Sequence, residues 1–299
     1  MTDRMLRPTV LRLVAVTTAT IWCAVAGPRA VGQAAAQPQV QRQIQPPIEP
    51  LSPLIEELHP FRAVLDATGF TGTTVIYDLK RNHWSGVHTE TADRRRIPAS
   101  TYKILNAMIA LETRAVASDA AVLRWDGVVR DRIEINQDLS LSEAFRLSAV
   151  PHFQALARAI GSERMQEWVQ RVGYGNEDIS GGIDQFWLTG GLRISPREQI
   201  QLLVRLYRSQ LPFAERTMRI ARMIMETERT PAFVVRAKTG LALLPEGRVG
   251  WWVGWVERGE DVFFFATVLE HPSDAPTFLA ARIDVTKALL GALHAFDQR

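Results

Sequence analysis

Residues 233–270 read FVVRAKTGLALLPEGRVGWWVGWVERGEDVFFFATVLE and contain three apolar runs. The runs, residues 233–238, 249–257 and 261–270, are rich in β-branched and aromatic residues, which favour strands. The stretch 241–248 is expected to be a loop between the first two. Strands joined by short connections pair antiparallel. This part of the chain therefore predicts an antiparallel meander of three strands.

Outward from this meander, further strands and helices are expected. Residues 73–79 and 84–87 are β-rich runs separated by a turn, and the apolar residues of 53–66 recur at helical spacing. Helical patterns dominate residues 99–230, and a closing helix is expected over 276–296. Strands separated by a helical block predict an α+β fold, with an antiparallel sheet flanked by terminal helices plus a helical subdomain. A cleft is expected where the two subdomains meet.

Two helix starts carry the pattern of a capping box, in which a hydroxyl and a carboxylate satisfy free backbone donors. One is Ser140-x-x-Glu143, and the other is Ser195-x-x-Glu198. In the second, Pro196 occupies the first helical position, where proline is favoured. Both serines are therefore predicted to have structural roles.

The first 36 residues have the layout of a secretory signal peptide with its cleavage region. Arginines precede an apolar run over residues 13–26, and small residues follow at 32–36. Because the run is too short for a comfortable membrane span, we expect cleavage, no stable span after processing, and a periplasmic or secreted mature protein. An uncleaved anchor is the alternative. Cys23, the only cysteine, lies inside this segment, which excludes a disulfide or a cysteine nucleophile from the processed chain.

The rest of the chain divides by composition. Residues 37–52 are rich in Gln and Pro and predict a disordered lead-in. Residues 53–299 are expected to form a single catalytic domain. Its sheet subdomain is predicted at about 53–98 and 231–299, and its helical subdomain at about 99–230.

Charge and histidine content limit the possible partners. The formal net charge is +3 and the pI about 9.3, with both signs scattered along the chain. No basic stripe with interleaved aromatics is visible, so no nucleic-acid partner is expected. The basic balance indicates either an ordinary surface or a cleft that attracts carboxylates. The six histidines are dispersed, and neither H-x-H nor H-E-x-x-H occurs, so no metal site is predicted.

The stretch PASTYK at residues 98–103 carries the strongest chemical pattern. Ser100 and Lys103 are one helical turn apart and share a face. A serine hydroxyl is a poor nucleophile without a base in reach, and a lysine can be that base only if it is neutral or modified. Burial would lower the pKa of the lysine. By itself the pattern also fits a capping serine beside a solvent-facing lysine.

The second pattern is Lys238-Thr239-Gly240, expected at the end of a strand. It offers a cation, a hydroxyl and a backbone that a substrate can approach closely, because Gly240 lacks a Cβ. A turn with a surface lysine is the alternative. An Ser-x-x-Lys pair before a helix followed by a downstream Lys-Thr-Gly is characteristic of penicillin-recognising enzymes. The Ser-Asp-Asn motif of class A enzymes is absent.

With these two patterns, the chain resembles the class D (oxacillinase-type) serine β-lactamases over about residues 73–288. Five further motifs in the family's order carry the resemblance: LSAVP at 147–151, YGN at 174–176, FWL at 186–188, LRIS at 192–195 and GWWVGWVE at 250–257. The resemblance implies β-lactam antibiotics as substrates. It also implies a serine β-lactamase or penicillin-binding transpeptidase fold. The tryptophans of the last motif are expected to be structural. No feature assigns an oligomeric state.

The resemblance implies roles for the residues of the reaction. Ser100 would be the acylated nucleophile. Lys103 would be the general base as N6-carboxylysine, formed with CO2 or bicarbonate, and no other cofactor is implied. Trp187 would donate its indole N–H to that carbamate. Ser148 would relay a proton to the lactam nitrogen, and Lys238 would set the electrostatics around that relay.

Other residues would shape the site or bind substrate. Thr239 and Arg282 would hold the substrate carboxylate, because the planar guanidinium can bind both oxygens. The backbone N–H groups of Ser100 and Leu241 would form the oxyanion hole. Leu241 departs from the family, which often has an aromatic residue there, so the substrate range is the property it affects.

The remaining implied residues surround the reacting groups. Val150 and Leu188 would form an apolar lid over the lysine. Tyr174 and Asn176 would line the site without a single chemical role.

Two other functions share these motifs. A penicillin-binding sensor domain is acylated but not turned over, and it usually follows several membrane spans. A D,D-peptidase acts on cell-wall peptides and more often has a polar residue where this chain has Val150. Hydrolysis of β-lactams, with antibiotic resistance as its consequence, is the leading prediction.

Overall fold

The computed structural model describes residues 54–297. All of them belong to one compact unit within Gln45–Arg299. The expectations for residues 1–36 and 37–52 fall outside the described part of the chain.

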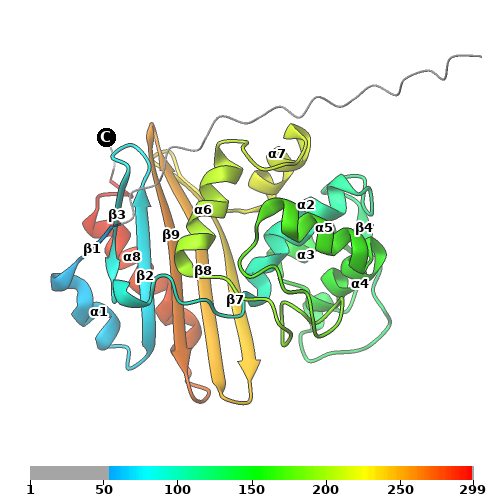
Figure 1. Ribbon diagram of the computed structural model, residues 1–299, viewed down its shortest axis with the longest axis horizontal. Coiled ribbons are helices and arrows are strands. Elements are labelled where there is room, and N and C mark those ends of the chain that lie inside the picture. Colours follow the sequence, from blue (N-terminus) through cyan, green and yellow to red (C-terminus); the bar gives the residue numbers. More distant parts are fainter. Residues whose placement is uncertain (1–53, 298–299) are drawn as a thin grey trace, which may run out of the picture. The chain divides into compact units, whose positions relative to one another are not determined.

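A seven-stranded sheet forms the framework, in the order β1-β3-β2-β9-β8-β7-β6 (Figure 1). Neighbours pair antiparallel except β1 and β3, which run parallel at one edge. The predicted α+β fold is confirmed, with this parallel edge as the difference. The strands of this sheet are β1 Ile55–Glu57, β2 Thr71–Asp78, β3 His83–Val87, β6 Glu226–Arg229, β7 Val234–Leu244, β8 Gly247–Arg258 and β9 Asp261–His271.

Helices cover both faces of the sheet. α6 (Pro196–Tyr207) packs against β2, β8 and β9 on one face, and α8 (Phe278–Ala292) packs against β8 and β9 on the other (Figure 1). Because successive strand residues point to opposite faces, Trp251 belongs to the hydrophobic cluster that contains α6. Its neighbour Trp252 belongs to the cluster that contains α8. Both tryptophans are core residues, as expected.

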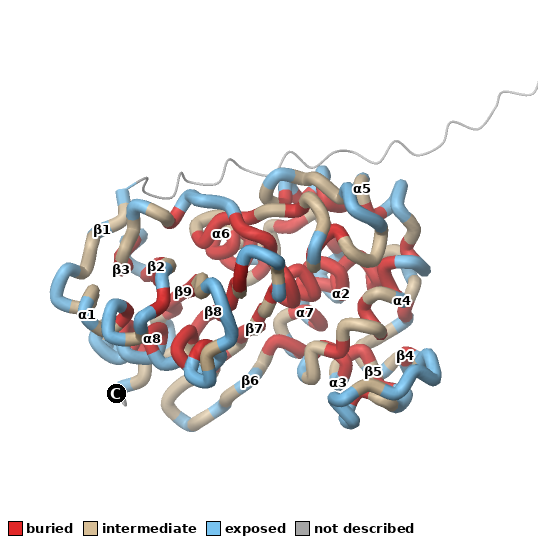
Figure 2. The backbone as a smooth tube through the Cα atoms, turned by 90° about the horizontal axis from the view of Figure 1, so that it is seen from below, coloured by how far each residue is buried: buried red, intermediate tan, exposed pale blue. Residues whose placement is uncertain are grey.

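The remaining helices stand beside the sheet. α2 is buried along nearly its whole length, from Lys103 to Leu111 (Figure 2), and packs against α4 and α7. Such a helix forms the centre of the helical part. The other elements there are α2 Lys103–Glu112, β4 Val122–Leu123, β5 Leu139–Ser140, α3 Leu141–Arg146, α4 Val150–Ile160, α5 Ser162–Val172 and α7 Glu215–Ile224.

Short helical segments complete the fold. α1 is Arg62–Asp66, and the 3₁₀ segments are His59–Phe61, Thr89–Thr91, Ala99–Tyr102 and Ile133–Ile135. α1 lies near α8. The two predicted capping boxes, at the starts of α3 and α6, are both present.

Four expectations about local structure were wrong. Residues 53–66 are not one helix, because 55–57 pair with β3 and the helical run starts only at His59, with Pro60 in its first turn. β7 continues through Lys-Thr-Gly, so the expected loop 241–248 is only the two-residue turn at 245–246. β6 was missed because Glu-Thr-Glu-Arg has the charged character of an edge strand rather than an apolar alternation. The helix expected from Ser100 begins at Lys103, and Ser100 itself lies in a 3₁₀ turn.

The proposed subdomain boundaries remain predictions. α6 lies within the expected helical range 99–230 but packs on the sheet. The Ser100 turn also contacts β7 and β8 directly. The Ser-x-x-Lys and Lys-Thr-Gly motifs therefore meet where the sheet and helices join.

Candidate active site

Ser100 lies in a tight turn against strand β7. Ala99, the residue before it, has the left-handed φ of 48°. The Thr101 hydroxyl donates to the Pro98 carbonyl at 2.7 Å. A Cβ on Gly240 would come within 3.0 Å of that carbonyl, so glycine in the Lys-Thr-Gly motif lets the strand approach the turn closely. The turn and the motif are thus held together by direct packing.

Lys103 is fully buried and faces Ser100. Its Nζ lies 2.7 Å from Ser100 Oγ, and the ring of Phe153 lies 5.5 Å from the same nitrogen. Burial holds the pKa of Lys103 well below its ordinary value, and the positive charges of Lys238 and Arg132 lower it further. A buried, deprotonated amine beside a hydroxyl can accept a proton, which an ammonium cannot.

Lys238 and Ser148 form the second pair. Lys238 Nζ on β7 donates to Ser148 Oγ at 2.9 Å, and it lies 5.5 Å from the ring of Phe145. Ser148 has a left-handed φ of 55°, a conformation that is uncommon for a non-glycine residue and often found at functional sites. Burial, and to a smaller extent the positive charges of Arg282 and Arg132, lower the pKa of Lys238 to about 7.

Two arginines add positive charge to the same region. Arg282 is buried, donates through Nη1 to the carbonyl of Gly240, and has a pKa lowered by burial to about 10. It is therefore not the solvated surface charge that its place in the last helix would favour. Arg132 donates to the carbonyl of Leu147 at 2.8 Å, immediately before Ser148. The sequence analysis missed Arg132, since no motif marks its loop.

The four lysines of the sequence differ sharply in their surroundings. Lys80 and Lys287 are exposed and form ion pairs with Asp261 and Glu228. Lys103 and Lys238 are buried, and neither forms an ion pair with any residue in 54–297. The positive charge of the buried Lys238 and Arg282, which has no paired carboxylate within residues 54–297, favours binding of an anion.

Trp187 lies in an aromatic cluster with Tyr102 and Phe186. Its ring stacks on Tyr102 with centroids 5.5 Å apart, and Tyr102 directly precedes Lys103. Phe186 contacts both rings edge-on. Within the described residues, the buried indole N–H of Trp187 has no hydrogen-bond partner. A buried donor without a partner is costly, so this N–H points to an acceptor that the side chains alone do not supply.

The other predicted site residues differ in burial and in contacts. Val150 begins α4, and both it and Leu188 are half-buried. Thr239 and Leu241 are also half-buried on β7, on either side of Gly240.

Tyr174 is buried against Tyr102, whereas Asn176 is exposed. Asn176 bonds to backbone groups of Gly191 and Arg193. Neither side chain hydrogen-bonds to Ser100 or Lys103. The structure therefore places this motif behind the reacting groups rather than among them.

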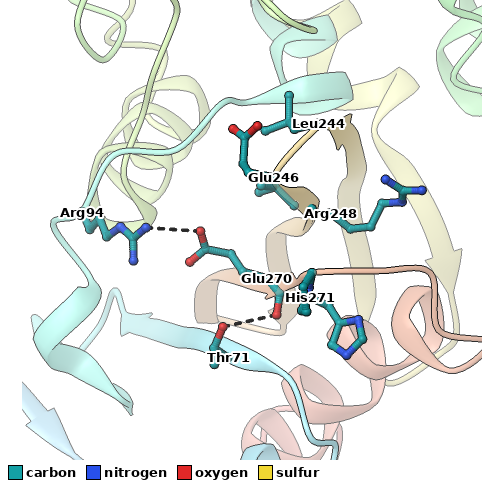
Figure 3. A pocket seen from close by; sticks show the side chains of 10 residues that line it. Thr71, Arg94, Leu244, Glu246, Arg248, Glu270 and His271 are labelled. Atoms are coloured by element: carbon teal, nitrogen blue, oxygen red, sulfur yellow. Dashed lines mark hydrogen bonds and ion pairs between the residues drawn. The ribbon is translucent and has the colours of Figure 1, made fainter.

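A separate cavity of about 260 Å³ lies at one end of β8 and β9 (Figure 3). Its two arginines already form ion pairs, Arg94 with Glu270 at 3.6 Å and Arg248 with Asp274 at 2.6 Å. None of the Ser100, Lys103, Ser148 and Lys238 cluster lines it. The chemistry therefore lies elsewhere than in this cavity.

Residues 54–297 contain neither a metal-ligand cluster nor a membrane-spanning helix. No three His, Cys, Asp or Glu side chains lie together as metal ligands would. No helix among these residues has the length and apolar content needed to cross a membrane.

Comparison with known proteins gives consistent matches. The family described as penicillin binding protein transpeptidase domain matches residues 71–291. β-Lactamase OXA-48 of Klebsiella pneumoniae is 41% identical over 219 residues, which are 73% of this chain and 82% of that protein. The probable β-lactamase YbxI of Bacillus subtilis (strain 168) is 42% identical over 196 residues, 66% of this chain and 73% of that protein.

Solved structures agree with these sequences. The class D β-lactamase YbXI from Nostoc is 41% identical with a TM-score of 0.76, covering 78% of this chain and 98% of that one. FUS-1 (OXA-85), a class D β-lactamase from Fusobacterium nucleatum, is 32% identical with a TM-score of 0.78, covering 81% and 100%.

Proposed function

The chain belongs to the class D serine β-lactamases, and we propose that Ser100 is the nucleophile with which it opens the β-lactam amide. The resemblance that the sequence motifs indicated is thereby confirmed. The contact of 2.7 Å between Ser100 Oγ and the buried Lys103 Nζ carries the proposal. It gives the hydroxyl a base within hydrogen-bond reach, which a serine nucleophile requires.

In the first half of the reaction, Ser100 Oγ attacks the lactam carbonyl and its proton passes to the base at position 103. The C–N bond of the ring then breaks, and the nitrogen takes a proton from Ser148. Lys238, 2.9 Å from the Ser148 hydroxyl, is placed to return that proton. Proton exchange with solvent then restores the base and Lys238. In the second half, water gives a proton to the base at position 103 as its oxygen attacks the acyl carbonyl, and Ser100 Oγ leaves with that proton.

The base is proposed to be Lys103 in its N-carboxylated form. Only a neutral amine reacts with CO2, and the burial that lowers the pKa of Lys103 favours the neutral amine. The carbamate supplies anionic acceptor oxygens in place of an amine. Trp187, with its buried and unpartnered N–H, fits as a donor to such an anion. Val150 and Leu188 would limit the access of water to it.

Charge and backbone donors complete the proposal. The N–H groups of Ser100 and Leu241 would stabilise the oxyanion. Thr239 and Arg282 would hold the substrate carboxylate, and the buried guanidinium at Gly240 supports this assignment. The mechanism requires no metal and no cofactor other than CO2.

We propose β-lactam antibiotics as the substrates and resistance as the result of their turnover. A periplasmic or secreted location is also a proposal, based on the signal-peptide pattern of residues 1–36.

Intact-mass spectrometry during exposure to a penicillin, with bicarbonate present, tests the proposed turnover. We expect an adduct on Ser100 that disappears while the drug is consumed, and no adduct on Ser100→Ala. An adduct that persists for hours would favour the sensor or D,D-peptidase alternatives. Absence of any adduct on folded protein would overturn the assignment of Ser100.

A further inference from the structure

The motif Tyr174-Gly175-Asn176 follows α5 and lies outside the proposed reaction. We propose that it is a positioning device: it fixes the loop and the aromatic stack that carry the Trp187 indole, the proposed donor to the carbamate, and so sets how tightly the enzyme binds CO2. This inference rests on the proposed N-carboxylation of Lys103. It assigns these residues no contact with substrate.

Asn176 anchors the far end of the loop that carries Trp187. Its Nδ2 donates to the Gly191 carbonyl at 2.9 Å, and its Oδ1 accepts from the Arg193 backbone N–H at 2.7 Å. Its own backbone N–H donates to the Arg193 carbonyl at 3.0 Å. The amide of Asn176 both donates and accepts at this place, whereas a carboxylate has no hydrogen to give to Gly191.

Gly175 allows the motif to lie directly on this loop. Its φ is +57°, and a Cβ on it would be 1.9 Å from the Arg193 carbonyl oxygen. Any other residue would push the two backbones apart. The next residue, Ile194, exchanges two backbone hydrogen bonds with Arg96, shortly before the Ser100 turn. The loop is thus tied to both the motif and the nucleophile segment.

Tyr174 holds the stack from the other side. Its ring meets Tyr102 edge-on at 5.4 Å, and Tyr102 stacks on Trp187 at 5.5 Å. Burial raises the pKa of Tyr174, and the nearby Thr101 and Gln199 side chains oppose part of that rise. The motif therefore reaches Trp187 by two routes, through the loop backbone and through the rings.

Trp187 depends on this support because no residue in 54–297 accepts its N–H and so orients it. A group that binds an anion gives full affinity only when neighbouring groups fix its orientation. A substitution that removes contacts of the motif should therefore weaken CO2 binding, and it should have less effect on the turnover rate of enzyme that is already carboxylated.

The test compares Asn176→Asp with Thr68→Ala. Thr68 also donates and accepts one side chain–backbone hydrogen bond, to Leu65 and from Phe70, in the turn before β2. Each variant is degassed and titrated with bicarbonate, and β-lactamase activity and the carbamate signal in ¹³C NMR are recorded. For Asn176→Asp we expect the half-saturating bicarbonate to rise roughly five- to tenfold. Activity at saturation should stay near the wild type.

Thr68→Ala should leave the bicarbonate titration unchanged even if it lowers the melting temperature equally. An unchanged titration for folded Asn176→Asp would overturn the inference while leaving the carbamate in place. A wild type with no carbamate signal and no response to bicarbonate would instead overturn the proposed base, and this inference with it.

A second pair of variants tests the ring route if Asn176→Asp does not fold. Tyr174→Phe keeps the ring contact and should titrate like the wild type. Tyr174→Leu removes the ring and should need more bicarbonate, again with near-normal activity at saturation. Equal titrations for the two variants would contradict the proposed route through Tyr102.

Discussion

Three serines in this chain, Ser100, Ser140 and Ser195, each have a charged residue three positions later, and the three pairs are of two kinds. At Ser140 and Ser195 the fourth residue is glutamate, and hydroxyl and carboxylate each accept a backbone N–H at the start of a helix. At Ser100 the fourth residue is lysine, and neither side chain caps a helix. The lysine is fully buried, whereas the glutamates keep access to solvent.

The difference shows what makes such a pair reactive. A carboxylate satisfies backbone donors and stabilises the helix start. A buried lysine caps no backbone N–H group there. Burial disfavours its charged form, so its pKa falls and its neutral amine can accept a proton. The spacing is the same in all three pairs. The proposed catalytic pair differs from the two structural pairs because its second residue is a lysine and is buried.

Removing the lysine should have the largest effect. In Lys103→Ala we expect kcat to fall roughly 10³-fold or more, because the base for both half-reactions is lost. Stopped-flow kinetics and intact mass should show slow acylation and an adduct that persists. Lys80→Ala, which removes an exposed lysine, serves as the control. Near-normal turnover in Lys103→Ala would show that the pair is not catalytic.

Ser148 should rank next. Ser148→Gly removes the hydroxyl and also suits the left-handed φ of 55°, so backbone strain does not confuse the result. We expect acylation to slow by about 10²-fold, with a melting temperature equal to or above that of the wild type. Ser148→Ala should slow acylation equally but be less stable. Full activity in Ser148→Gly would remove the hydroxyl from the proton relay.

The buried lysines should also reduce stability in a pH-dependent way. Lys238 has its pKa lowered to about 7, so between pH 7 and its ordinary value the unfolded chain binds more protons than the folded one. Lys238 should therefore make the free energy of unfolding rise with pH in that window, and it contributes at most about 1.4 kcal/mol per unit. Lys238→Met lacks this contribution, so its advantage over the wild type should be greatest below pH 7. A difference that stays constant from pH 6.5 to 9.5 would show that Lys238 is protonated throughout.

The capping serines should have the smallest effect. Ser140→Ala and Ser195→Ala should each lower the free energy of unfolding by about 1 kcal/mol. Denaturant unfolding measures this change, and kcat/KM should stay close to that of the wild type. A large loss of activity without loss of stability in either variant would erase the distinction between the two kinds of pair.

Much of the site could be predicted because its motifs are short and local. The pairing of Ser100 with Lys103 follows from helical spacing. That Lys238 meets Ser148, 90 residues away, came only from the family resemblance. Arg132 was missed because its role depends on a loop folding back to Leu147, which no local pattern encodes.

The fold was predictable where the apolar pattern was strong. The strands β8 and β9 alternate between two buried faces, and their apolar residues marked them clearly. β1 and β6 were missed because short edge strands form through pairing with a neighbour rather than through their own residues.

The protonation state of Lys103 tests the central claim most directly. With only four lysines, labelling each Cε with ¹³C gives a spectrum that Lys80→Arg, Lys287→Arg and Lys238→Arg can assign. In buffer free of CO2, we predict that the Lys103 signal at pH 7 is that of a neutral amine. An ammonium signal that persists to pH 9 would contradict the account, because a protonated Lys103 could neither accept the proton of Ser100 nor react with CO2.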